Sequence, residues 1–198
     1  MKTNYVLIDF ENVQPKNMTL LNGGPFKIKV FMGNSQSKIP LEMASALQIF
    51  GTDVEYIQIE GNGNNALDFH IAFYIGKLSI ENPDSFFHII SKDHGFDPLI
   101  RHLKKLKILC QRSINITDIP LVKISNSKSS AEKVQAIIEN LIKRGVSKPR
   151  TLKTLKSSIK ALFVNKLDDS EFDTLFDMLL KTELVKINDG KISYHFNK

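Results

Sequence analysis

The sequence predicts an α/β fold, in which a parallel sheet with flanking helices is followed by a smaller helical domain. Strand-like and helix-like segments alternate over residues 1–115, an order typical of parallel sheets. Strand-like runs such as "VLI" and "FFHII" are continuously apolar, as in strands buried on both faces. After residue 123 the composition changes and amphipathic helical patterns follow.

Short runs rich in branched and aromatic residues predict five strands. They are Tyr5–Phe10, Lys27–Met32, Val54–Ile59, Phe86–Ile90 and, more weakly, Ile108–Gln111. Helices are predicted between them over 39–51, 64–78 and 97–107. The helix over 64–78 is apolar almost all round, so we expect it to be buried. Asp97 is the expected N-cap of the third helix, with Pro98 at its first position.

Domain boundaries follow from composition. We expect a first domain over residues 1–123, a linker rich in Ser, Asn and Lys over 124–131, and a second domain over 132–198. The second domain shows three helical patterns, over 131–145, 151–163 and 168–182. Two short strands then flank Asn188-Asp189-Gly190, a strong hairpin signal. Three helices and a hairpin are in the order of a winged helix.

Composition excludes several classes of protein. No apolar run approaches the roughly 18 residues of a membrane span, and the N-terminus lacks the features of a signal peptide. The single cysteine, Cys110, cannot form an internal disulfide, which favours a reducing cytoplasm. Residues 1–125 carry 13 basic and 12 acidic side chains, whereas residues 126–198 carry 14 and 9. A basic second part indicates either a polyanion partner or a solvated surface.

Acidic residues gather at one predicted edge of the sheet, where parallel strands end and ligands bind. Asp9 ends the first strand, Asp93 follows the fourth, and Asp68 and Asp97 lie near the starts of the helices that leave this edge. Glu11 and Asn12 come directly after the first strand. The mutual repulsion of these acids favours a bound cation. Because their ligand atoms are all oxygen, that cation is expected to be Mg²⁺ or Mn²⁺ rather than zinc. Water activation and displacement at phosphorus is the chemistry that one or two such ions support.

Each acid also has a simpler explanation. Asp97 serves as a helix cap in that case, Asp68 as a favourable charge near a helix N-terminus, Asp9 and Asp93 as loop ties, and Glu11 as a solvated residue. By topology the same edge also holds Asn34, Gln36, Ser91, Asn65 and Arg101, which are candidates for contacts with the acids or the substrate.

Three motifs resemble those of the PIN-like nucleases, specifically the NYN branch. "LIDFENV" resembles the opening Asp-x-x-Asn, with Asp9 and Asn12 in those places. "NNALDFHIAFYIG" is similar to the central helix with its inward Asp68, and "SKDHGFDPLIRHL" resembles the strand end that carries Ser91 and Asp93. The resemblance covers about residues 4–118. It implies a metal-dependent endoribonuclease on a Rossmann-like sheet, in which Asn12 orients the metal ligand Asp9.

One departure from the family pattern concerns the third motif. The family often has a second Asp two residues after the first, where this chain has Gly95. Asp97 then either replaces that acid or leaves a site of three acids. The departure keeps open a second reading, in which the chain is a catalytically inactive RNA- or DNA-binding or scaffold protein. The substrate class, RNA or also DNA, and self-association stay open.

A basic stretch in the second domain is the candidate nucleic-acid surface. It contains Lys148, Arg150, Lys153, Lys156 and Lys160, and the last three share one predicted helical face. A solvated helix face is the alternative. A third function class rests on "GNGNNA", residues 61–66, which matches a dinucleotide fingerprint. The charge of Asp68 in the same first turn opposes a pyrophosphate there, so the sequence favours a nuclease.

Overall fold

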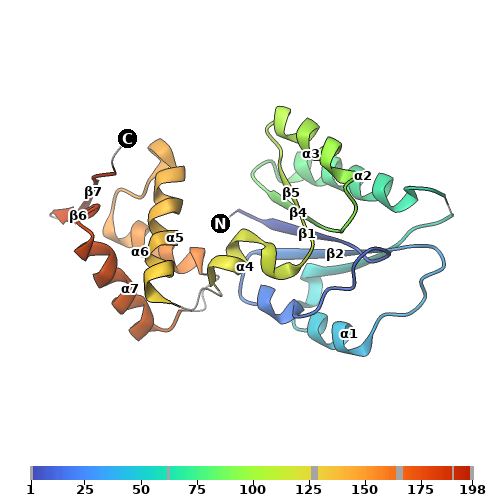
Figure 1. The fold of residues 1–198 in the computed structure, drawn as a ribbon, viewed down its shortest axis with the longest axis horizontal. Helices are drawn as coiled ribbons and strands as arrows, with labels where there is room; N and C mark the ends of the chain where they lie inside the picture. Colours follow the sequence, from blue (N-terminus) through green and yellow to red (C-terminus); the bar gives the residue numbers. More distant parts are fainter. Residues whose placement is uncertain (1, 62, 126–128, 164–166, 189, 197–198) are drawn as a thin grey trace. The chain divides into compact units, whose positions relative to one another are not determined.

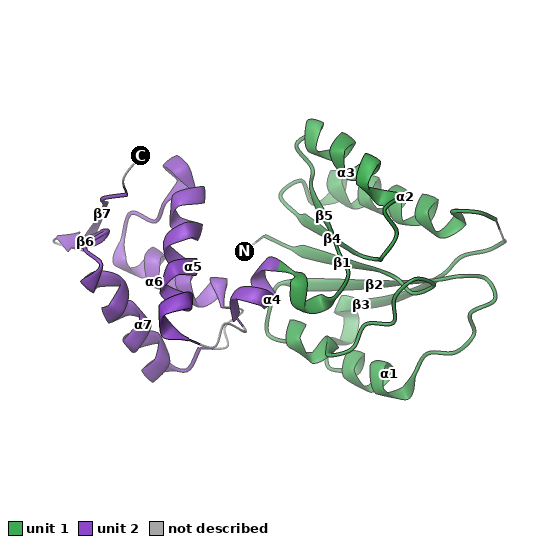
Figure 2. Cartoon of the chain, viewed as in Figure 1, with its two compact units in different colours: residues 1–119 green, residues 120–198 purple. Residues whose placement is uncertain are grey.

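The computed structural model describes residues 2–61, 63–125, 129–163, 167–188 and 190–196. The chain divides into two compact units, residues 1–119 and 120–198 (Figure 2). The expected boundary lay at residue 123. Instead, residues 124–125 end a short helix, α4 (Pro120–Ser125), and residues 129–131 begin α5 (Ser130–Lys143). The rest of the expected linker, 126–128, lies outside the described residues.

A five-stranded sheet forms the centre of the first unit. Its strands lie in the order β3-β2-β1-β4-β5, and every neighbouring pair is parallel. The strands are β1 (Asn4–Asp9), β2 (Phe26–Met32), β3 (Val54–Gln58), β4 (Phe86–Ile90) and β5 (Leu109–Ser113). The predicted α/β class is therefore confirmed. Because β1 pairs with both β2 and β4, the ends of these three strands meet at one edge.

Helices cover both faces of this sheet (Figure 1). One face packs against α2 (Ala66–Glu81) and α3 (Phe96–Lys105), and the other faces α1 (Leu41–Gln48). Short 3-10 turns connect the elements: η1 (Met18–Leu21), η2 (Gly51–Asp53) and η3 (Ile116–Asp118). All six residues of β1 are buried, as its continuous apolar run predicts. Among the described residues, no helix is both long and apolar enough to cross a bilayer.

The expectation that α2 is buried on all sides is wrong. Leu67, Ile71, Ile75 and Leu78 are buried against the sheet. On the outer side, Phe69, Phe73 and Ile80 are 70%, 65% and 82% exposed. A sheet covers only one side of a helix, and in the described part of the chain nothing covers the other side.

The expected N-cap of α3 is also wrong. The helix begins at Phe96, its N-cap is Gly95, and no side chain caps it. Asp97 lies inside the first turn, where its amide donates to the carbonyl of His94 at 3.0 Å. The helix starts two residues earlier than expected because the amide of Gly95 donates to Asp93 Oδ1 at 2.7 Å, which fixes the turn there.

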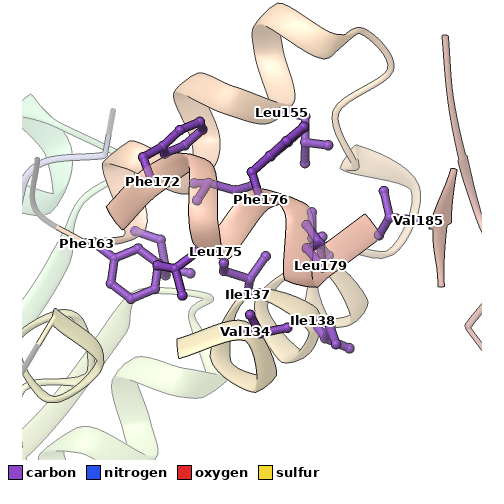
Figure 3. Packing of buried hydrophobic residues seen from close by; sticks show 13 residues of the cluster. Val134, Ile137, Ile138, Leu155, Phe163, Phe172, Leu175, Phe176, Leu179 and Val185 are labelled. Atoms are coloured by element: carbon purple, nitrogen blue, oxygen red, sulfur yellow. The ribbon is translucent and has the colours of Figure 1, made fainter. Parts of the chain in front are cut away.

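Besides α4, the second unit contains the three longer helices and the pair of antiparallel strands that the sequence predicts. After α5 and a 3-10 turn, η4 (Gly145–Ser147), come α6 (Leu152–Leu162) and α7 (Asp169–Lys181). The strands β6 (Val185–Asn188) and β7 (Lys191–Tyr194) pair antiparallel; Asp189 of the predicted turn lies outside the described residues. Figure 3 shows the core, where Ile137, Leu155 and Leu175 from the three helices pack together.

Side-chain caps define where these helices begin. Ser129, Thr151 and Asp168 precede α5, α6 and α7, and each accepts a hydrogen bond from the backbone amide three residues later. Such caps satisfy amides that have no partner within the helix.

A buried histidine lies in the middle of the sheet of the first unit. His88 in β4 is 2% exposed, and its Nε2 donates to Asn4 Oδ1 at 2.9 Å. The amide oxygen of Asn4 faces His88 because the amide nitrogen donates to the carbonyl of Lys2. Among the described residues, the other ring nitrogen has no partner. Burial lowers the pKa of His88 to about 3, so the ring is neutral in the folded protein.

This burial predicts acid sensitivity of the first unit. Below pH of about 6.5 the unfolded chain protonates His88 and the folded chain does not, so stability falls as the pH falls. From pH 7 to 5 the wild type should lose about 2 kcal/mol more than His88→Gln, whose amide does not titrate. Hydrogen exchange of β1 and β4 peptides over a urea series measures the difference. Equal losses in both proteins would contradict the assignment.

Candidate active site

A buried carboxylate lies at the end of the central strand. Asp9 is 1% exposed and accepts three hydrogen bonds. The backbone amide of Asn12 donates to Oδ1 at 3.2 Å, while the Asn12 side chain donates to Oδ2 at 3.0 Å and Ser91 Oγ to Oδ2 at 2.7 Å. These hydrogen bonds compensate the burial of a polar group in the protein interior.

Ser91 connects this carboxylate to the next strand. It follows β4, is fully buried, and its Oγ also accepts from the amide of Asp93 at 3.0 Å. Asp93 Oδ1 in turn accepts from the amide of Gly95. A Cβ atom at Gly95 would lie 3.1 Å from Asp93 Oδ1, so glycine permits the close turn. One chain of hydrogen bonds therefore fixes the positions of both Asp9 and Asp93.

The third predicted aspartate, Asp68, is half-buried in the first turn of α2. Burial, followed in order of importance by the charges of Asp9, Asp93 and Glu11, raises its pKa to about 6. Each of these three acids is thus within electrostatic range of Asp68. Negative charge at this edge of the sheet is not compensated around Asp68.

Glu11 lies against the backbone at the end of β2. A Cβ atom at Gly33 would be 1.7 Å from Glu11 Oε1, so any larger residue would displace this side chain. Gln36 holds the same loop, since its side chain accepts from the amide of Gly33 at 2.9 Å and donates to the carbonyl of Phe10 at 3.3 Å. The backbone carbonyl of Asn34 accepts from Gln58. Gln36 is therefore a loop-holding residue.

Asp97 lies in a different environment from the other acids. Arg112 Nε donates to its Oδ1 at 3.0 Å, and His94 Nδ1 lies 3.0 Å from its Oδ2. The hydrogen bond from Arg112, followed by that from His94, lowers the pKa of Asp97 to about 2. Asp97 is not one of the charges that raise the pKa of Asp68. The structure thus pairs Asp97 with a cation and leaves the other three aspartates together.

Sequence reasoning missed Arg112. This residue lies in β5, one position past the expected end of the strand at residue 111, and its Nη1 donates to the carbonyl of Ser91 at 3.2 Å. The sequence did contain a signal for this role, since a basic residue lies near the end of a predicted strand at the acidic edge. Of the remaining candidates, Asn65 is the exposed N-cap residue of α2 with φ of 62°, and Arg101 is exposed on α3.

The donor set suits a hard cation. Asp9, Glu11, Asp68 and Asp93 offer only oxygen, which Mg²⁺ and Mn²⁺ prefer. As the side chains stand, no three His, Cys, Asp or Glu among the described residues are arranged to hold a metal ion. The acids are therefore close enough to interact electrostatically but form no closed ligand shell. The chemistry of the group fits a divalent cation, and the raised pKa of Asp68 is the observation that supports this fit.

The predicted basic surface of the second unit is partly used within that unit. Lys156 Nζ lies 5.2 Å from the ring centre of Phe176, and Lys160 Nζ lies 2.9 Å from Asp169 Oδ1; both partners belong to α7. Lys148 donates to the carbonyl of Gly145 and lies over Tyr194 and Phe196. Arg150 and Lys153 are exposed. The shared helical face of Lys156 and Lys160 therefore packs toward α7.

The charge on Asp68 should destabilise the fold. Its folded pKa of about 6 exceeds the unfolded value of 3.8, so the ionised form above pH 6 disfavours folding. Asp68→Asn should raise the free energy of unfolding at pH 8 by about 1 kcal/mol, since solvent screens a half-exposed carboxylate. At pH 4 the difference should shrink toward zero.

Asp97→Asn is the matched control in the same denaturation experiment. It removes a carboxylate whose pKa is lowered by Arg112 and His94, so it should destabilise the protein at pH 8. If Asp68→Asn were instead the destabilising variant at pH 8, the acids would not repel one another as described.

Comparison with known protein families places residues 3–113 in the PIN domain. The matched segment contains all five strands of the sheet, the helices between them and every acid of the candidate site. No curated protein and no solved structure matches the chain.

Proposed function

The chain belongs to the PIN domain family, whose members are typically metal-dependent nucleases, and on this premise we propose that it is an endoribonuclease of the NYN branch. It hydrolyses RNA phosphodiester bonds at the carboxyl edge of the sheet. The observation that carries the proposal is the buried Asp9, with its three hydrogen-bond donors, within range of the uncompensated charge of Asp68.

Asp9, Asp68 and Asp93 are the residues that would hold one or two Mg²⁺ or Mn²⁺ ions, with Glu11 as a further ligand or a substrate contact. When bound, such an ion activates water for attack at phosphorus and stabilises the leaving oxygen. Asp97 is a weaker candidate ligand than these aspartates, because Arg112 already neutralises its charge.

The chain's own groups prepare this edge for a cation. Asn12 and Ser91 fix the direction of the Asp9 carboxylate, as residues behind metal ligands commonly do. The amide of Gly95 does the same for Asp93. Without a cation, Asp68 holds a proton part of the time near pH 6, and binding a cation favours its carboxylate form.

Cleavage of RNA tests the activity directly. Wild type should cleave single-stranded RNA with Mg²⁺ or Mn²⁺, and EDTA should abolish cleavage. Asp9→Asn should reduce the rate by at least about 100-fold and Ser91→Ala by about 10-fold, because each disturbs the central ligand. The variant Asp97→Asn tests whether Asp97 is a metal ligand or only the ion-pair partner of Arg112. A loss comparable to that of Asp9→Asn would make Asp97 a ligand.

A negative outcome also discriminates. If wild type cleaves neither RNA nor DNA with either metal, yet binds RNA, the chain is a binding or scaffold protein. Gly95, which stands where the family often has an acid, is the feature that favours this second candidate.

For the second unit we propose a winged-helix-like module that contacts nucleic-acid phosphates through exposed cations. The order of three helices and a hairpin supports the module, and the exposure of Arg150 and Lys153 supports the contact. Lys156 and Lys160 mainly stabilise α7 instead, because their ammonium groups already lie over its aromatic rings and beside Asp169.

Charge reversal tests this surface. Arg150→Glu with Lys153→Glu should weaken RNA binding and lower the salt slope of log Kd by about 2. Lys181→Glu with Lys186→Glu makes the same charge change elsewhere on the unit and is the matched control. Filter binding between low and moderate salt measures both proteins. Equal RNA affinities of the two double variants would show that Arg150 and Lys153 do not contact the RNA.

A further inference from the structure

The outer face of α2 is apolar along its whole length. With about 100° of rotation per residue, Phe69, Phe73, Gly76 and Ile80 fall on the side opposite the buried Leu67, Ile71, Ile75 and Leu78. The two phenylalanines and the isoleucine are among the most exposed large apolar side chains of the first unit. We call these four outer residues the α2 seam.

The spacing of the α2 seam is that of a helix-packing surface. Its residues are four, three and four positions apart, which is the 3.5-residue repeat by which one helix packs along another. Exposed apolar residues scattered singly need no explanation, but a continuous row of them marks an interaction surface.

Gly76 is the second, independent observation. It lies in the interior of a 16-residue helix, where glycine is less favourable than alanine. A Cβ atom at this position would meet nothing within 4 Å, so the fold of this chain does not require glycine there. Absence of a side chain at the middle of the seam allows another backbone to approach closely from outside.

The seam is complementary to itself when two copies run antiparallel. With the two-fold axis between Tyr74 and Ile75, Phe69 lies opposite the partner's Ile80, and Phe73 lies opposite the partner's Gly76. The largest side chain of the seam thus meets its smallest, and the two outer positions pair apolar groups. We propose that the occupant of the α2 seam is a second copy of this chain, in a symmetric dimer.

The size of the seam indicates a reversible dimer. Large apolar side chains bury roughly 150–250 Å² each, so six of them contribute on the order of 900 Å². With flanking contacts this approaches the roughly 1,200 Å² of the smaller specific interfaces. The dimer should therefore form and dissociate with protein concentration.

Single-stranded nucleic acid fits this face less well. Exposed phenylalanines can stack bases, but phosphate binding needs several cations beside them. The helix α2, of which every residue is described, carries Lys77 as its one Lys or Arg residue, and that side chain lies 5.9 Å from the ring centre of Tyr74. Neither Ile80 nor Gly76 offers a plane for stacking. The dimer proposal does not depend on nuclease activity.

Sedimentation velocity of the full chain over a concentration series, without RNA, tests the proposal. Wild type should shift from monomer to dimer, and Phe73→Ser and Gly76→Leu should each raise the dissociation constant at least about tenfold. Gly76→Ala should weaken the dimer while raising the Tm of the monomer by about 2 °C, an outcome that a structural role within the chain would not produce. Leu41→Ser, at an 81% exposed position on α1, is the control and should leave the dimer unchanged.

Cysteine cross-linking tests the antiparallel arrangement. In a Cys110→Ser background, a mixture of Phe69→Cys and Ile80→Cys proteins should form mixed disulfides, and neither variant alone should cross-link efficiently. Self-cross-linking of Phe69→Cys would overturn the antiparallel pairing. A wild type that stays monomeric at all concentrations would overturn the dimer. A wild type that stays monomeric, together with loss of RNA binding in Phe73→Ser, would show that the occupant is nucleic acid.

Discussion

The buried, hydrogen-bonded carboxylate of Asp9 is the interaction on which the rest of the site depends. A charge that is 1% exposed is unfavourable in a protein interior unless donors surround it. Asn12 supplies two donors from the loop after β1, and Ser91 supplies one from the end of β4. The same serine fixes Asp93, so the parallel pairing of β1 with β4 and the arrangement of two aspartates are set together.

Two aspartates near this edge show how environment decides role. Asp97 has Arg112 and His94 beside it and is strongly acidic. Asp68 has burial and three other acids around it, and its pKa is raised. A carboxylate that is already paired has little to gain from a cation, whereas an unpaired group of acids is stabilised by one. This contrast explains why Asp68 is a stronger candidate ligand than Asp97, although the sequence places both at the same edge.

Local patterns predicted the strands to within two residues and the meeting of Asp9, Asp68 and Asp93, because parallel strands must end at one edge. Contacts between distant segments were not predictable in this way. The pairing of Arg112 with Asp97 joins β5 to α3, and the contacts of Lys156 and Lys160 depend on how α6 lies against α7. The sequence showed that α2 is apolar almost all round, but the pattern does not tell which side of the helix the sheet covers.

Proton release on Mn²⁺ binding tests the central claim most directly. Calorimetric titrations at pH 6, in buffers of different ionisation enthalpy, count the protons displaced by the metal. With the pKa of Asp68 at about 6, wild type should release about half a proton per site, and Asp68→Asn should release none from this position. Metal binding with no difference in proton release between the two proteins, or no Mn²⁺ binding by the wild type, would contradict the assignment of these acids to a cation.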